Sequence, residues 1–233
     1  MNYPSITIPP VVEALYQRYQ SIPMPYFIAP QSKTLKRKIY KGKGRIEDIE
    51  GVLRGYTNDT RPKSEILKSL TIGIDCSGFV TWLYDAYTMD KEGKRIWTYF
   101  QRKTKNPLDM ILFKIQPVVS MLNAATLTSD LNCTKIKATK DIRPMDLIKL
   151  SGGKHVVLVH TVYLDNNIPV KFSYIHATSG VGVCMGYVNI TEPDKEVTMQ
   201  DWLPLEPVPT NQPSDLIRYK VNINGIRRPH FLS

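Results

Sequence analysis

The segment GIDCSGFV, residues 73–80, places a cysteine between an aspartate and a Ser-Gly pair. From Cys76 onward, apolar residues recur at the spacing of one helix face, which predicts a helix that begins at Cys76 with Asp75 as its N-cap. A thiol in the first helical turn faces unsatisfied backbone N–H groups and the positive end of the helix dipole, and both favour the nucleophilic thiolate. The small residues Ser77 and Gly78 leave room for a substrate carbonyl, and the Cys76 N–H could donate to an oxyanion.

A nucleophilic cysteine needs a base, and the chain has four histidines. His155 opens an apolar predicted strand, and His160, five residues later, points to the opposite face of that strand. His176 lies near the end of the next predicted strand, so a hairpin of the two strands brings His155 and His176 to the same end of the sheet. This arrangement predicts a base and a second group that holds the base in one tautomer. His160 and His230 are interpreted as structural residues.

The three cysteines are Cys76, Cys133 and Cys184, and they form no C-x-x-C pair. An odd number of cysteines in this arrangement argues against a disulfide framework and against a zinc site. Cys133 and Cys184 are interpreted as small buried hydrophobic residues, with Cys184 in a predicted strand over residues 181–190. The sequence implies neither a metal nor an organic cofactor.

Helix patterns come first along the chain and strand patterns follow. Helices are predicted at residues 10–21 and 46–55, a helical turn at 64–70, and an apolar helix-like run at 107–127 that Pro117 interrupts. From about residue 145, segments rich in Val, Ile and Tyr alternate with short turns, which predicts an antiparallel meander. The predicted strands are residues 146–150, 155–164, 171–177, 181–190 and 215–221. Helices followed by such a sheet predict an α+β fold.

The 233-residue chain carries a net charge of +10, which attracts anionic partners such as nucleic acid, acidic lipid or an anionic cell-wall polymer. Residues 33–45 contain seven basic side chains and no acidic one; we interpret them as a solvated basic loop, with a polyanion-docking surface as the alternative. The absence of an 18-residue apolar run argues against a membrane span. The N-terminal residues lack the basic and apolar regions of a secretory signal peptide.

The motifs DCSGFV, PMDLIKL, KHVVLVHTVYL and YIHATSG, in this order, resemble those of the NlpC-type cysteine peptidases, papain-like enzymes that cut the peptide stems of bacterial cell walls. The resemblance covers about residues 70–190. It implies a papain-like α+β fold, in which the catalytic cysteine at a helix N-terminus packs on an antiparallel sheet that carries the histidines. It also implies that Cys76 is the nucleophile, His155 the base and His176 the orienting third residue.

Asp75 and Ser77 match the positions that flank the family's cysteine, and we expect them on the substrate side. The family often has a tyrosine before the cysteine, and Tyr56 is the nearest candidate for it. The sequence departs from the family's pattern in two places near the predicted strands. Met145 stands where the family usually has a glycine before Asp-Leu, and the segment after His155 lacks the usual glycine.

Residues 1–60 match nothing in the family. Their apolar residues at positions 11, 12, 15 and 16 predict a helix that buries one face, so we expect an N-terminal helical and basic extension that packs on the domain, with its basic stretch near the cleft rim. Residues 61–233 would then form the peptidase domain. The long interval between the cysteine and the first histidine predicts a helical insertion around residues 89–140.

The function implied by the resemblance is hydrolysis of an amide bond in a peptidoglycan stem peptide, such as the D-glutamyl to diamino acid bond, through a thioester and without a cofactor. Such a substrate implies a location outside the cytoplasm, in the periplasm, in the cell wall or secreted. One alternative is an amidase or acyltransferase of the same fold that acts on a lipid or protein. Another is a non-catalytic basic module that binds nucleic acid. The chain lacks the interleaved aromatic and basic residues of single-strand binders, which argues against this alternative.

Overall fold

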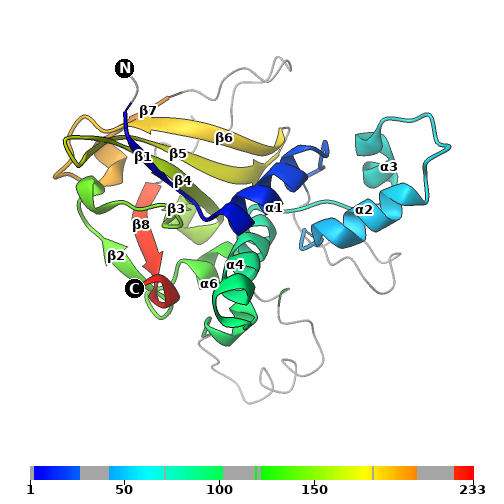
Figure 1. Cartoon of the computed structure of the whole chain (residues 1–233), viewed down its shortest axis with the longest axis horizontal. Helices are drawn as coiled ribbons and strands as arrows, with labels where there is room; N and C mark the ends of the chain where they lie inside the picture. The colour runs from blue at the N-terminus through cyan, green and yellow to red at the C-terminus, as the bar shows by residue number, and fades with distance from the viewer. Residues whose placement is uncertain are drawn as a thin grey trace. The chain divides into compact units, whose positions relative to one another are not determined.

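The computed structural model describes residues 3–26, 42–70, 72–101, 119, 122–179, 181–203 and 223–233. Within these ranges the chain is mixed α+β, with five α-helices and an antiparallel sheet of eight strands, which confirms the predicted class (Figure 1). The chain divides into two compact units. The sheet unit comprises residues 1–10, 124–176 and 184–233, and the helical unit comprises residues 11–123 and 177–183.

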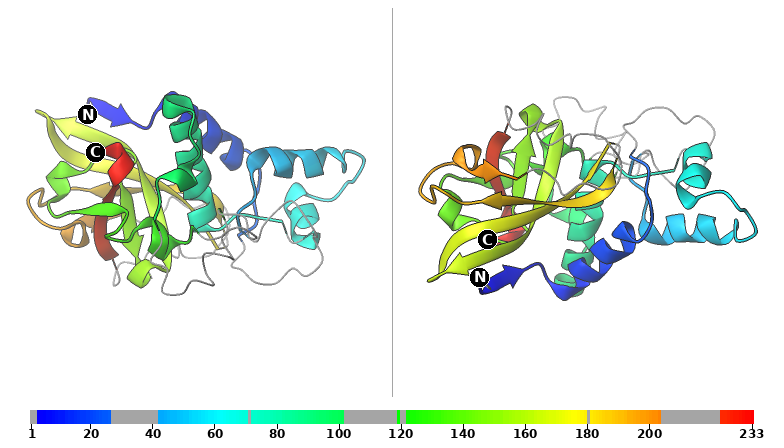
Figure 2. Two further views of the ribbon diagram at one scale, coloured as in Figure 1. Left: turned by 90° about the horizontal axis from the view of Figure 1, so that it is seen from below. Right: turned by 90° about the horizontal axis from the view of Figure 1, so that it is seen from above.

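The sheet has the strand order β2-β8-β3-β4-β5-β6-β7, with β1 paired to β4. Strands β3 to β6 are neighbours both in sequence and in the sheet, as the predicted meander requires, and the long strands β4, β5 and β6 twist along their length (Figure 2). The predicted strand at 215–221 lies outside the described residues. The strands are β1 Ser5–Thr7, β2 Cys133–Ile136, β3 Leu147–Leu150, β4 His155–Asp165, β5 Ile168–Thr178, β6 Gly182–Asn189, β7 Asp201–Trp202 and β8 Ile223–Pro229.

Strand β4 is the centre of this sheet. One of its edges pairs with β5, while on the other edge β3 pairs with residues 155–158 and β1 pairs with residues 161–163. All residues of β4 from 155 to 162 are buried, because the run HVVLV supplies apolar side chains to both faces. Strand β4 ends in a tight turn, in which Asn166 and Asn167 take the positive φ values of 47° and 63° that a two-residue hairpin of this kind requires.

A bulge interrupts β4 in its middle. The register with β5 shifts between Val159 and Thr161, so that His160 is the extra residue. The Nδ1 atom of His160 lies 2.8 Å from Thr161 Oγ1 and 3.4 Å from Ser173 Oγ. Ser173 and His176 are three positions apart on β5 and therefore face opposite sides of the sheet. His160 and His176 thus lie on opposite faces, as strand alternation predicts.

The helices lie close to their predicted positions. They are α1 Pro10–Gln20, α2 Ile46–Arg54, α3 Lys63–Ser69 and α4 Cys76–Glu92, together with the short α6 Ala124–Leu127 in the sheet unit. Helix α6 corresponds to the end of the predicted run at 107–127, most of which lies outside the described residues. None of the helices in the described ranges combines the length and the hydropathy that crossing a membrane requires.

Helix α1 packs on α4 through aromatic rings. The rings of Tyr16 and Tyr19 meet the ring of Phe79 edge-on, with centroids 6.4 and 5.6 Å apart. The Tyr19 hydroxyl donates to the carbonyl of Gly44 at 2.9 Å, and this tyrosine is fully buried. Aromatic pairs of this geometry contribute about 0.5–1.5 kcal/mol beyond the area they bury. The apolar face predicted for α1 is therefore a packing face, and it packs against the helix that begins at Cys76.

Candidate active site

The N-terminus of α4 has the local structure that its sequence predicts. Asp75 is the extended N-cap residue, and its Oδ1 atom accepts hydrogen bonds from the Gly78 N–H at 2.6 Å and from the Ser77 hydroxyl at 2.8 Å. Cys76 is the first helical residue, is buried and is not part of a disulfide. Its thiol belongs to the first turn of a 17-residue helix, where the helix dipole favours the thiolate.

Gly78 has a packing role that differs from the predicted one. A Cβ atom at this position would lie 2.0 Å from the carbonyl oxygen of Gly42 and 3.0 Å from Cδ of Lys43. The same Gly42 carbonyl accepts a hydrogen bond of 2.8 Å from the Asp75 N–H. The space beside Gly78 is therefore filled by the backbone at residue 42, and the expectation that Gly78 leaves room for a substrate is corrected. Only glycine allows this close approach.

Lys43 completes the hydrogen bonding at the start of α4. Its ammonium group donates to Asp75 Oδ1 at 3.0 Å, to the Ser77 hydroxyl oxygen, and to the carbonyl of Leu122 at 3.1 Å. These three acceptors use all three ammonium protons. The Lys43 side chain is only 5% exposed and that of Asp75 is 16% exposed, so the ion pair is largely shielded from solvent.

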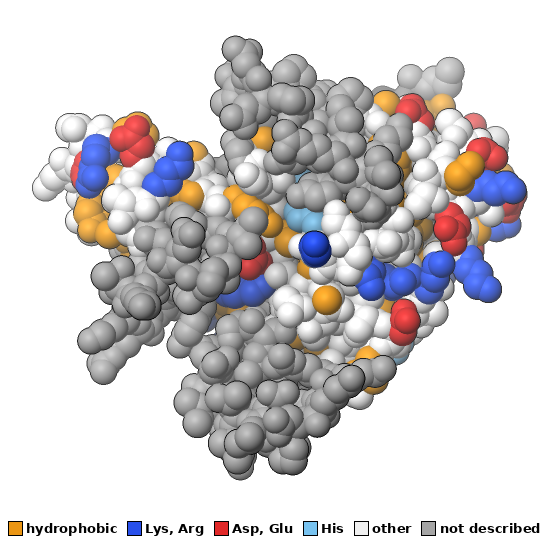
Figure 3. All heavy atoms as spheres, turned by 180° about the vertical axis from the view of Figure 1, so that it is seen from behind, with side chains coloured by type: hydrophobic (Ala, Val, Ile, Leu, Met, Phe, Trp, Pro, Cys, Tyr) orange, Lys and Arg blue, Asp and Glu red, His pale blue; other side chains and the backbone are white. Residues whose placement is uncertain are grey.

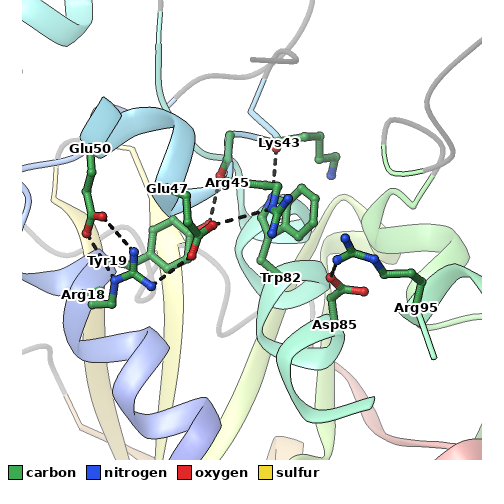
Figure 4. A network of polar contacts seen from close by, with 10 residues as sticks. Arg18, Tyr19, Lys43, Arg45, Glu47, Glu50, Trp82, Asp85 and Arg95 are labelled. Carbon is green, nitrogen blue, oxygen red and sulfur yellow. Dashed lines mark hydrogen bonds and ion pairs between the residues drawn. The ribbon is translucent and has the colours of Figure 1, made fainter. Parts of the chain in front are cut away.

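The backbone of Lys43 is also held in place. The indole N–H of Trp82 donates to the Lys43 carbonyl at 2.9 Å, and Figure 4 shows the indole beside this segment. The guanidinium of Arg45 lies over the same indole, 5.3 Å from the ring centroid. The interpretation of residues 33–45 as a solvated loop is therefore wrong for Lys43, while Lys33, Lys36, Arg37, Lys38 and Lys41 lie outside the described residues.

The two predicted histidines meet in the sheet unit. The Nε2 atom of His155 lies 2.9 Å from Nδ1 of His176, and the two rings are nearly perpendicular, at 82°. Both side chains are buried. The hairpin of β4 and β5 produces this contact, as the strand pattern predicts. On its other side, Nε2 of His176 lies 3.2 Å from Sγ of Cys184 on β6. Cys184 is buried, as expected, and in addition its sulfur is a hydrogen-bond partner of His176.

Burial sets the protonation of this group. Desolvation lowers the pKa of His155 to about 4, and it lowers the pKa of His176 well below its usual value, with a smaller contribution from the neighbouring His155. Desolvation raises the pKa of the Cys184 thiol to about 12. At neutral pH all three groups are therefore uncharged, and the same burial makes His155 a weaker base than a solvated imidazole.

The PMDLIKL segment is anchored by a buried ion pair. Both oxygens of Asp146 contact the Arg228 guanidinium at 2.8 Å, and the Arg143 N–H donates to Asp146 Oδ2 at 2.8 Å. Burial raises the pKa of Asp146, and Arg228 opposes this shift. Met145 has a φ of 74°, in the left-handed region that favours glycine. The backbone here thus has the conformation that a glycine would adopt, at the position where the NlpC-type pattern has one.

Tyr56 lies in the turn that follows α2, is half-buried, and its N–H donates to the carbonyl of Leu53 at 3.0 Å. Among the described residues, the side-chain hydrogen bonds of Asp75 and Ser77 involve Lys43, Gly78 and each other, and none involves Tyr56. The substrate-side role expected for Tyr56 stays a prediction.

The candidate residues therefore form two groups. Asp75, Cys76 and Ser77 belong to the helical unit, whereas His155 and His176 belong to the sheet unit. Each group is assembled by its own secondary structure, and the pairing of the thiol with the imidazole stays a prediction.

The helical unit also contains a cavity of about 470 Å³. Apolar side chains such as Leu15 and Met89 line it together with Trp82 and charged groups. Arg18 binds the carboxylates of Glu47 and Glu50 at 2.9 and 2.8 Å (Figure 4). The charged groups of the wall are thus partly neutralised by one another.

On the surface too, basic side chains lie beside acidic ones. On the face shown in Figure 3, Lys and Arg side chains are interspersed with Asp and Glu. Exposed pairs such as Lys135 with Glu196, at 3.2 Å, and Lys140 with Asp194, at 2.5 Å, neutralise positive charge locally. Such pairs contribute little to stability.

Within the described ranges, no three His, Cys, Asp or Glu side chains are arranged to hold a metal ion. Comparison of the chain with protein-family models, with curated proteins and with solved structures finds no match. The functional interpretation therefore depends on the motifs of the sequence and on the two groups of side chains described above.

Proposed function

We propose that this protein is a cysteine amidase or endopeptidase with a papain-like fold of the NlpC type. The observation that carries the proposal is the contact of 2.9 Å between His155 and His176, because it supplies a neutral base and an orienting group in one buried pair. The thiol of Cys76 at the first turn of α4 supplies the nucleophile. The left-handed backbone at Met145 agrees with the NlpC-type pattern.

In the proposed reaction, the Cys76 thiol transfers its proton to His155 and the thiolate attacks the carbonyl carbon of an amide. The C–N bond then breaks as the imidazolium of His155 protonates the leaving amine. Next, His155 takes a proton from water, and the resulting hydroxide attacks the thioester, which releases the acid and the Cys76 thiolate. The thiolate then takes the proton from the His155 imidazolium, which restores the thiol and the neutral base. The mechanism requires the thiol to come within hydrogen-bond reach of His155, and this pairing is part of the proposal.

The Cys76 N–H is the candidate donor to the oxyanion that forms during attack. Lys43 and Asp75 contribute indirectly in this account, because they fix the first turn of α4 through the contacts at 3.0 and 2.6 Å. The side chain of Ser77 is bonded to both of these residues. We therefore assign Asp75 and Ser77 first to the support of the nucleophile, and their contact with substrate stays a prediction.

By resemblance, the substrate we propose is a peptidoglycan stem peptide cut between D-glutamate and a diamino acid. The net charge of +10 agrees with an anionic wall target, and such a target implies action outside the cytoplasm. The same chemistry on a lipid or protein amide would leave stem peptides unchanged, so the substrate can be tested separately from the reaction.

The test is mass analysis of purified muropeptides after incubation with the parent protein, Cys76→Ala and Cys133→Ala. Cys133 is a suitable control because it is also buried, and its thiol donates to the Leu127 carbonyl at 3.0 Å in the sheet unit. We expect the parent and Cys133→Ala to produce two fragments whose masses sum to the stem peptide plus one water. Intact muropeptides with the folded parent, or cleavage by Cys76→Ala, would contradict the proposal.

A further inference from the structure

The contact between His176 and Cys184 carries a second proposal, which rests on the proposed role of His155. We propose that Cys184 is a positioning residue: its sulfur accepts a hydrogen bond from the Nε2–H of His176 and thereby holds His155 in the tautomer that can act as a base. The three residues lie on the neighbouring strands β4, β5 and β6 of the sheet unit, as Figure 1 shows for the strands.

The number of protons on His176 limits which of its two contacts can be a donation. Both of its ring nitrogens are engaged, Nδ1 with His155 Nε2 at 2.9 Å and Nε2 with Cys184 Sγ at 3.2 Å. A neutral imidazole has one N–H and one lone pair, so one of these contacts is a donation by His176 and the other is an acceptance. Burial keeps the pKa of this imidazole well below its usual value, which agrees with a single ring proton.

Two proton arrangements satisfy both contacts. In the first, His176 donates from Nε2 to Cys184 and accepts at Nδ1 from the Nε2–H of His155, so that Nδ1 of His155 is unprotonated and carries a lone pair. In the second, the thiol of Cys184 donates to His176, which donates in turn to Nε2 of His155. The proton of a neutral His155 then sits on Nδ1, and no nitrogen of His155 is available as a base.

Proton transfer from the nucleophile selects the first arrangement. Once His155 is an imidazolium, both of its nitrogens carry protons, and its Nε2–H needs an acceptor at Nδ1 of His176. The first arrangement provides this acceptor before and after the transfer, whereas the second requires His176 to move its own proton. The Cys184 thiol stays neutral, since burial raises its pKa to about 12, and a neutral thiol has a sulfur lone pair that can accept a weak hydrogen bond from the Nε2–H of His176.

The consequence of removing the sulfur follows from burial. In Cys184→Ala, the Nε2–H of His176 would be left without its acceptor in a buried site, which disfavours that tautomer. We expect His176 to move its proton to Nδ1, facing His155, and we expect the Cys76 alkylation rate at pH 7 to fall about tenfold, less than for loss of the base itself. Cys184→Ser keeps an acceptor and should retain both the parent tautomer and the parent rate.

The experiment uses the full chain labelled with ¹⁵N-histidine, and long-range ¹H–¹⁵N spectra at neutral pH to report which ring nitrogen carries the proton. The parent and Cys184→Ser should show His155 and His176 protonated at Nε2, and Cys184→Ala should show His176 protonated at Nδ1. Cys133→Ala, a second buried cysteine of the sheet unit, is the control and should match the parent.

A parent His176 protonated at Nδ1, or a His176 tautomer unchanged in Cys184→Ala, would overturn the inference. The parent spectrum decides the question even if Cys184→Ala does not fold. The tautomer is read without any substrate, so its outcome is separate from that of muropeptide cleavage. If the tautomers match while muropeptides stay intact, the proton arrangement is supported and the proposed function fails.

Discussion

Replacement of Lys43 by methionine tests whether the buried ammonium holds the start of α4. Methionine keeps most of the aliphatic volume and removes the charge. Asp75 would then lose its only ion-pair partner among the described residues, and the carbonyl of Leu122 would lose the donor at 3.1 Å. The side chains of Lys43 and Asp75 are 5% and 16% exposed, so water cannot fully replace the lost contacts.

The size of the stability loss in Lys43→Met can be worked out from these contacts. Removing one partner of a buried ion pair costs about 3–5 kcal/mol. Asp75 keeps its hydrogen bonds from the Gly78 N–H and the Ser77 hydroxyl, which lowers the penalty for its carboxylate. We therefore expect Lys43→Met to lower the free energy of unfolding by about 2–4 kcal/mol.

The measurement is urea unfolding followed by both tryptophan fluorescence and far-UV circular dichroism. Coincident curves would establish a two-state transition. With an m value of about 2–3 kcal/mol per M, the expected loss lowers the urea midpoint by about 1 M. Lys135→Met is the matched control, because Lys135 pairs with Glu196 at 3.2 Å with both side chains about half exposed, and its loss should cost less than about 1 kcal/mol. A loss for Lys43→Met no larger than that of Lys135→Met would refute the reasoning.

Three further predictions concern the other parts of the site. Gly78→Ala should lower the free energy of unfolding in urea by about 2–4 kcal/mol, because its Cβ would lie 2.0 Å from the Gly42 carbonyl oxygen. Gly51→Ala in α2, where the nearest atom to an added Cβ is 3.7 Å away, should be neutral or stabilising, and equal effects of the two changes would contradict this. In amide hydrolysis assays, His155→Ala should be as damaging as Cys76→Ala, and His160→Ala, on the other face, should stay near parent activity; the reverse order would mean that the assigned faces are wrong. The free energy of unfolding should fall as the pH drops from about 6.5 to about 4, because His155 has a pKa of about 6.5 when unfolded and about 4 when folded, so that the unfolded chain takes up the proton first. An equal decline in His155→Gln would contradict this assignment.

The elements that sequence reasoning predicted well are those with local signals. The helix of Cys76 begins at the predicted residue because Asp75 is a side-chain N-cap and the apolar spacing starts next to it. The contact of His155 with His176 was predictable because a short turn joins their strands. The turn at Asn166 and Asn167 has the residues that left-handed φ values favour.

The elements that were missed depend on partners distant in sequence. Lys43 appeared to belong to a solvated basic run, and its acceptors Asp75 and Leu122 lie 32 and 79 residues away. Strand β2 has four residues and pairs with the distant β8, and β1 has only three residues, so neither had a strong local pattern. The contact of Cys184 with His176 depends on how β6 aligns with β5, which strand patterns do not specify.

The most direct test of the central claim is the alkylation of Cys76 by iodoacetamide as a function of pH, read by peptide mapping of the full chain. Burial raises the pKa of Cys133 and of Cys184 to about 12, so both serve as internal controls that should react little at neutral pH. A nucleophilic Cys76 assisted by His155 should react with an inflection well below the ~8.5 of a free thiol, and His155→Ala should lose this early inflection. An inflection at or above that value in the parent, or the same profile in His155→Ala, would contradict the account.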